Sequence, residues 1–135
     1  MPAASSSNPS RPPATAVAAR WEELPADHPM PLLERRRVIG EKAMISHIVL
    51  QKGFVLQTHS HENEQFSVVL RGRLRFGIGA EGSPQRREVV VSAGGVLHLP
   101  SNVPHSAVAE EETLVLDIFS PPSVGTGIDR PPRTH

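Results

Sequence analysis

Apolar and polar residues alternate in short runs through the middle of the chain, and glycine, proline and asparagine separate the runs. Because successive side chains of a strand point to opposite faces, this alternation predicts strands with one buried face. About nine or ten strands at this spacing are typical of an all-β sandwich or barrel. The clearest runs cover residues 32–39, 43–50, 54–61, 65–70, 73–78, 87–91, 96–100, 105–109 and 113–119. A helical period is absent, and residues 22–24 suffice for one short turn at most.

The two ends of the chain differ from this middle part. Residues 1–19 are rich in proline, alanine and serine, and residues 121–135 have a similar composition. Segments with so few large apolar side chains cannot bury enough surface to order themselves. We therefore expect a disordered N-terminal tail (1–19), one folded domain (20–120) and a C-terminal tail (121–135).

Composition excludes several classes of function. The 135 residues suit one domain, and 14 basic residues balance 14 acidic ones, so charge gives no reason to expect nucleic acid or a membrane as partner. Cysteine is absent, which excludes disulfides and thiolate metal sites. We find no apolar run long enough for a signal peptide or a membrane span, and we therefore expect a soluble cytoplasmic protein.

Two histidines, His59 and His61, stand two residues apart in a run expected to be extended. Their imidazoles would then lie on the same side of the strand and converge on one ion. Gln65 follows where the next strand would bring it back past the pair. Transition ions take three or four such donors, so a further ligand must come from elsewhere in the chain.

A second motif, one half of the chain away, supplies the context that His-x-His alone lacks. Gly53, His59, His61, position 65 and Gly72 fit the spacing of the first motif of the cupin superfamily, which the sequence resembles. The residues that fit the second cupin motif are Gly94, Pro100 and His105. Asn102 replaces the usual glycine there, and Ala109 replaces the usual asparagine. Asparagine tolerates left-handed backbone better than most residues do, so the first departure is mild.

This resemblance, over about residues 32–119, implies a double-stranded β-helix, the jelly-roll barrel of cupins. It implies one divalent ion (Fe, Mn, Ni, Zn or Cu) held by His59, His61, Gln65 and His105. It also implies a small-molecule substrate and a homodimer. A cupin barrel that has lost its metal is the alternative, because a fold does not guarantee a function.

Gln65 shapes the expected chemistry, because most metal-binding cupins have glutamate there. Three imidazoles and an amide leave the charge of the ion uncompensated, which favours anionic substrate oxygens and Lewis-acid chemistry. The sequence resembles the small pectin-degradation cupins that open unsaturated uronates, although Ser-Val-Gly-Thr-Gly replaces their usual continuation after Pro-Pro. We expect an isomerase or lyase acting on a sugar-acid-like substrate. The alternatives are a metal-dependent dioxygenase of the quercetinase type and a non-catalytic metabolite-binding or sensor cupin.

Other residues are weaker candidates. Ser67 shares a strand face with Gln65 and should line the cavity, where its hydroxyl could orient a substrate. His47 is a candidate general base, although a buried histidine with a structural partner is the favoured interpretation. For His98, too, a structural role is favoured over a catalytic one. The sequence leaves open whether Asp117 faces the cavity. Three arginines could grip a substrate carboxylate, but alternation with apolar residues favours solvent or a partner subunit for them: Arg71, Arg73 and Arg75.

Overall fold

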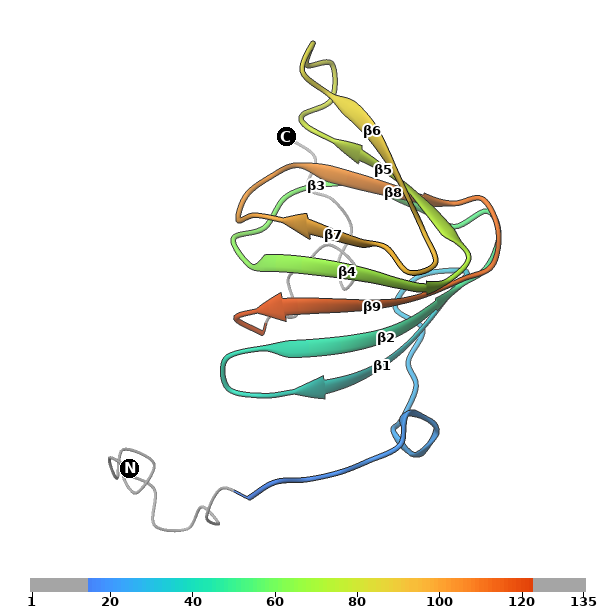
Figure 1. Cartoon of the computed structure of the whole chain (residues 1–135), viewed down its shortest axis with the longest axis vertical. Coiled ribbons are helices and arrows are strands. Elements are labelled where there is room, and N and C mark those ends of the chain that lie inside the picture. The colour runs from blue at the N-terminus through green and yellow to red at the C-terminus, as the bar shows by residue number, and fades with distance from the viewer. Residues whose placement is uncertain (1–14, 123–135) are drawn as a thin grey trace, which may run out of the picture.

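Nine strands form two antiparallel sheets in the computed structural model, which describes residues 15–122 (Figure 1). A five-stranded sheet has the order β1-β2-β9-β4-β7, and a four-stranded sheet has the order β3-β8-β5-β6. The strands are β1 (Leu33–Ile39), β2 (Met44–Leu50), β3 (Val55–His59), β4 (Glu64–Arg71), β5 (Arg73–Ile78), β6 (Arg87–Ser92), β7 (Val96–Leu99), β8 (His105–Ala109) and β9 (Thr113–Ser120). The all-β barrel expected from the alternation is thereby confirmed.

The alternation places one apolar side of each strand inside the barrel. Val69 and Ala109 are fully buried, and Ile48, Val115 and Phe119 are at most 2% exposed. These residues come from both sheets, so the inner faces share one core. Burying such side chains is the main favourable contribution to the stability of the fold.

One strand is shorter than expected. β3 ends at His59, whereas the sequence predicted an extended run as far as His61. The pairing of β3 with β8 shifts register between Leu56 and His59. After His59 the backbone is hydrogen-bonded to the loop before β8, where the backbone amide of Asn102 donates to the carbonyl of His61 at 2.8 Å. His61 therefore lies in the loop between β3 and β4 and not in a strand.

The turn between β4 and β5 depends on glycine. Gly72 has a φ of 86°, a conformation that side chains other than glycine rarely adopt. A Cβ at this position would lie 2.3 Å from the carbonyl oxygen of Glu112. The turn thus packs directly against the β8–β9 connection, and the glycine of the first motif has a structural reason.

The segment before β1 wraps the edge of the five-stranded sheet. Its residues Trp21–Glu23 form a 3₁₀ turn, and Asp27 pairs with Arg35 of β1 through an isolated bridge. Residues 15–19 have no regular secondary structure, and the rest of the expected N-terminal tail, like most of the C-terminal one, lies outside the described residues. Within residues 15–122, no helix has the length and apolar character needed to cross a membrane.

Candidate metal centre

Three histidines from distant parts of the chain meet at one end of the barrel. His59 ends β3, and it pairs directly with His105, the first residue of β8. Each of the three offers a ring nitrogen within 4.8 Å of the others. The ring centroids of His59 and His105 are 4.4 Å apart, and those of His61 and His105 are 5.1 Å apart. The structure thus brings together the histidines that the two sequence motifs nominated.

The same hydrogen-bond arrangement orients all three rings. Nδ1 of each histidine donates to a backbone carbonyl two residues away: His59 to Gln57 at 2.9 Å, His61 to Asn63 at 3.0 Å and His105 to Val103 at 2.8 Å. A carbonyl only accepts, so Nδ1 carries the proton and Nε2 keeps its lone pair. This arrangement of the second ring nitrogen is typical of metal-binding histidines.

Two observations indicate that a cation fits among these lone pairs. Nε2 of His105 is buried and has no hydrogen-bond partner in the part of the chain that the structure describes. Nε2 of His61 lies 3.1 Å from Oε1 of Gln65, although both atoms are acceptors. Exchanging the amide oxygen and nitrogen of Gln65 by rotation would break its hydrogen bond to Ser67. The NH₂ group of Gln65 donates to the Ser67 hydroxyl, which in turn donates to Asp117. The residues therefore fit a divalent ion held by His59, His61, Gln65 and His105.

Burial keeps one of these histidines, His105, neutral. His105 is 3% exposed and His61 is 9% exposed. Burial lowers the pKa of His105 to about 4, and the neighbouring His59 and His61 act in the same direction. A histidine with such a pKa is unprotonated at neutral pH and ready to bind a metal.

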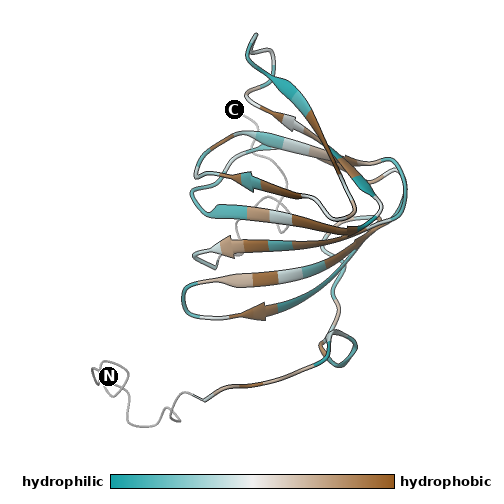
Figure 2. Cartoon of the chain, viewed as in Figure 1, coloured by the Kyte–Doolittle hydropathy of each residue, from teal (hydrophilic) through white to brown (hydrophobic). Residues whose placement is uncertain are grey.

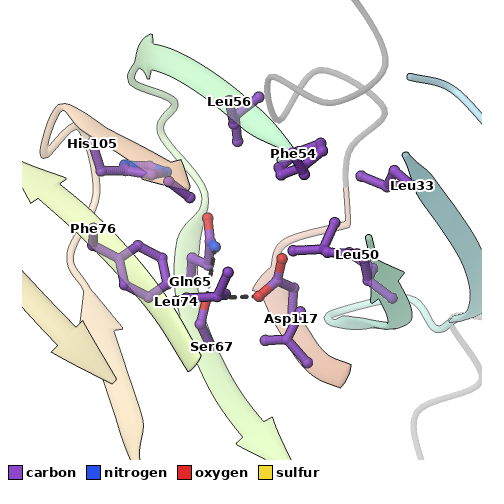
Figure 3. Close-up of a pocket in the computed structure, with 13 residues that line it drawn as sticks. Leu33, Leu50, Phe54, Leu56, Gln65, Ser67, Leu74, Phe76, His105 and Asp117 are labelled. Atoms are coloured by element: carbon purple, nitrogen blue, oxygen red, sulfur yellow. Dashed lines mark hydrogen bonds between the residues drawn. The ribbon is translucent and has the colours of Figure 1, made fainter. Parts of the chain in front are cut away.

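A small cavity extends from this centre into the barrel (Figure 3). Its volume is about 30 Å³, enough for one or two water molecules, so a larger substrate must extend outward from it. Most of its lining is apolar, and the polar part consists of Gln65, Ser67, His105 and Asp117. Ser67 lines the cavity, as its shared face with Gln65 predicted.

Asp117 is the carboxylate of this cavity, a position that the sequence left open. Its Oδ1 accepts a hydrogen bond of 2.6 Å from the Ser67 hydroxyl, which also accepts one of 3.0 Å from the Gln65 amide. Figure 3 shows these three side chains in line, on β4 and β9. Burial raises the pKa of Asp117 to about 6, with the Ser67 and Gln65 hydrogen bonds opposing the rise. A buried carboxyl group with this pKa exchanges protons readily near neutral pH.

Two further histidines do not reach the cavity. His47 lies on the outer face of β2, since its neighbour Ile48 lines the cavity, and its ring packs against Trp21 with centroids 5.0 Å apart. This placement counts against the catalytic role that the sequence allowed for His47. His98 also lies outside, stacked on Phe66 and hydrogen-bonded to Glu64 at 2.6 Å.

The row of arginines also faces outward. Arg75 lies between the cavity residues Leu74 and Phe76 and binds Glu110 and Glu88 at the surface. Arg71 and Arg73 are exposed. These placements agree with the alternation of the strand, which favoured solvent or a partner over a substrate carboxylate.

The loop before β8 shows how the departure from the second motif is accommodated. Asn102 has a φ of 67°, the left-handed conformation for which the motif normally has glycine. Its amide bonds to the carbonyl of His61, so this turn connects the loops that carry His61 and His105. Asparagine adopts this conformation at lower cost than other residues with a side chain, so the loop keeps its shape.

Comparison with known proteins gives results that agree with this architecture. A family model described as "Cupin domain" matches residues 46–119. No curated protein sequence gives a significant match. Among solved structures, an RmlC-like cupin from Shewanella frigidimarina has a TM-score of 0.71 and 23% identity, covering 80% of this chain and 93% of its own.

Two further structures extend the comparison. KdgF from Halomonas sp. has a TM-score of 0.65 and 28% identity, with coverage of 76% of this chain and 92% of its own. A variant of oxalate decarboxylase from Bacillus subtilis has a TM-score of 0.69 and 19% identity over 84% of this chain, but only 33% of its own length is covered. The likeness to the decarboxylase therefore concerns the fold of one barrel.

Proposed function

The chain belongs to the cupin family, and we propose that it is an enzyme whose divalent ion acts as a Lewis acid on a small anionic substrate. The expected reactions are isomerisation, ring opening or elimination on a sugar-acid-like molecule. The observation that carries this proposal is the combination of a neutral ligand set with a buried carboxylate, Asp117, on the wall of the same cavity. The uronate class of substrate rests on the motif resemblance described above.

The neutral donors favour this chemistry. His59, His61, His105 and Gln65 would hold the ion without contributing negative charge. A divalent ion bound there polarises a carbonyl or hydroxyl oxygen and stabilises the negative charge that develops on it. Since no ligand offsets the ion's charge, an anionic substrate is bound more tightly than a neutral one.

Asp117, held by Ser67, is positioned to transfer the proton. In its ionised form, Asp117 can take a proton from a substrate hydroxyl or from the carbon beside a carbonyl, and it can return the proton to a neighbouring position. Such a transfer leaves the number of protons on substrate and enzyme unchanged. Ser67 fixes the carboxylate through its 2.6 Å hydrogen bond, so Asp117 is held toward the cavity.

Metal analysis and an assay together test this proposal. The full chain, expressed with each candidate metal in turn, should contain about one ion per molecule by elemental analysis. The chain should convert an unsaturated uronate to its linear keto form, and NMR monitors this conversion. Chelation of the metal should abolish it. Consumption of oxygen with a flavonol or a diketone would instead support a dioxygenase. Less than about a tenth of an ion per chain would support a non-catalytic binding protein.

A substitution separates the charge argument from the fold. Replacing Gln65 with glutamate adds a negative ligand at an unchanged position. We expect Gln65→Glu to keep the metal and to bind simple carboxylate inhibitors more weakly, because the net charge of the centre falls. Inhibition as strong as in the wild type would refute the charge argument while leaving the metal site intact.

A further inference from the structure

Arg37 lies on the inner face of the five-stranded sheet, in the same cross-strand row as the polar residues of the cavity. It shares its face of β1 with Leu33, which lines the cavity. Arg37 pairs with Ser46, Ser46 pairs with Asp117, and Asp117 pairs with Ser67. The backbones of Arg37 and Asp117 are therefore separated by two strand spacings, roughly 10 Å.

The row crosses the sheet in the half that is nearer the histidines. β1 and β9 finish at this end of the sheet, whereas β2 and β4 begin there, as the left side of Figure 1 shows. Arg37 is two residues before the end of β1, and Gln65 is the second residue of β4. An arginine side chain extending from this position can approach a molecule that projects outward from the metal centre.

The guanidinium of Arg37 is poorly satisfied. Its Nη1 is buried and has no hydrogen-bond partner among residues 15–122, and its Nη2 lies 3.7 Å from Asp27, beyond hydrogen-bonding distance. Its neighbour on the same face, Arg35, instead binds both oxygens of Asp27, at 3.0 and 2.7 Å. Asp27 is thus engaged by Arg35, and it attracts Arg37 without binding it. A buried donor left in this state costs free energy that a ligand can recover.

We propose that Arg37 binds the carboxylate of the substrate whose oxygen atoms reach the three-histidine centre. This inference rests on the proposed function and names its substrate-anchoring residue. The planar guanidinium presents two parallel N–H groups that match a carboxylate, which is stronger and more directional than a single hydrogen bond. A substrate held at both ends has a fixed orientation toward Asp117, because β9 lies between β1, which carries Arg37, and β4, which carries Gln65.

The experiment measures binding to the metal-loaded full chain by calorimetry, with D-galacturonate and its neutral methyl ester as probes. The wild type should bind the acid more tightly than the ester. Arg37→Met should weaken binding of the acid about tenfold or more and leave binding of the ester unchanged. Arg37→Lys keeps the charge but loses the two-pronged geometry, so it should restore only part of the affinity. Arg71→Met, at an exposed position at the far end of β4, is the matched control and should behave as the wild type.

The outcomes separate this inference from the proposed function. If chelation abolishes binding of the acid but Arg37→Met keeps the wild-type preference for acid over ester, Arg37 is not the anchor and the metal function stands. If the wild type binds neither probe, both the substrate class and the anchor are wrong. Thermal unfolding of each variant shows whether a loss of affinity is due to misfolding, and an Arg37→Met chain as stable as the wild type that binds the acid tenfold more weakly supports the anchor.

Discussion

The inner and outer faces of the five-stranded sheet differ in where polar and apolar residues stand. The inner face carries a buried polar row, in which Ser46 and Ser67 are each 1% exposed and Asp117 is 8% exposed. The outer face of the same strands carries apolar residues that are only half-buried: Ile45, Val49, Phe66, Val68, Leu114, Leu116 and Ile118. Figure 2 shows brown, apolar positions recurring along these strands.

The difference indicates two functions for one sheet. Buried polar groups cost free energy unless they are hydrogen-bonded, and the linked chain of Gln65, Ser67 and Asp117 is the arrangement that a reactive site requires. A contiguous apolar face open to water is typical of a surface that another protein covers. We therefore assign the chemistry to the inner face and propose that a second copy of the chain covers the outer face.

The largest expected effect concerns the histidines themselves. His105→Ala removes the most buried ligand, so the metal content should fall from about one ion per chain to less than about a tenth. Elemental analysis of the full chain measures this. His98→Ala is the control, because His98 is an exposed histidine on the outer face and should leave the content unchanged. If the His105→Ala variant still contained about one ion per chain, the metal site could not be at the inner face.

The next effect concerns the carboxylate of the polar row. Asp117→Asn keeps the size of the side chain but removes the proton acceptor, so kcat should fall about 100-fold while metal content stays the same. Glu64→Gln, on the adjacent strand but on the outer face, should retain full activity. If Asp117→Asn lost its metal together with its activity, Asp117 would support the centre and not the reaction.

The difference between the two faces of the sheet also explains what the sequence could and could not predict. Alternation on β4 correctly placed Ser67 inside, on the same face as Gln65, because polar and apolar residues differ there. On β9, both faces are apolar around Asp117: Leu116 and Ile118 lie outside, and Val115 and Phe119 lie inside. A strand that is apolar on both faces has no visible period, and the direction of Asp117 could not be inferred.

Two other positions depended on contacts across the barrel. Arg35 and Arg37 share one side of β1 by alternation, but only the pairing of β1 with β2, and of β2 with β9, shows that this side faces inward. His47 alternates with apolar residues as a core residue would, yet it is covered from outside by Trp21. Local patterns fix which residues share a face, whereas the packing of distant segments decides what that face contacts.

A smaller effect tests the partner of the outer face. Leu116 lies near the middle of that face, paired with His47 and Val68 on the adjacent strands. A twofold axis places both copies of a substitution in the interface, so Leu116→Glu should weaken dimerisation roughly tenfold or more. Sedimentation velocity over a range of concentrations measures the change. Val90→Glu, at an exposed position on β6 of the other sheet, is the control. A wild type that is monomeric at every concentration would contradict the proposal that a second copy covers the outer face.

The smallest effect concerns the segment before β1, which contacts both faces at the edge of the sheet. Its Trp21 packs on His47 outside, and its Asp27 binds the buried Arg35 of the inner side. The hydrogen bond from Arg35 lowers the pKa of Asp27 below its usual 3.8. A lowered carboxyl pKa adds stability above pH 3.8, and this stability is lost as the pH falls through the folded-state pKa.

Asp27→Asn should therefore lower the free energy of unfolding at pH 7 by about 1 kcal/mol, a modest value because half of the Asp27 side chain is exposed to solvent. Urea unfolding of wild type and variant measures the difference, which should shrink as the pH falls below 3.8. Glu22→Gln removes a carboxylate from an ion pair in which both side chains are exposed, and it should change stability little at any pH. If the two substitutions had equal effects, the contact with Arg35 would contribute no more than a solvent-exposed ion pair, and the segment would be held to the sheet by the packing of Trp21 instead.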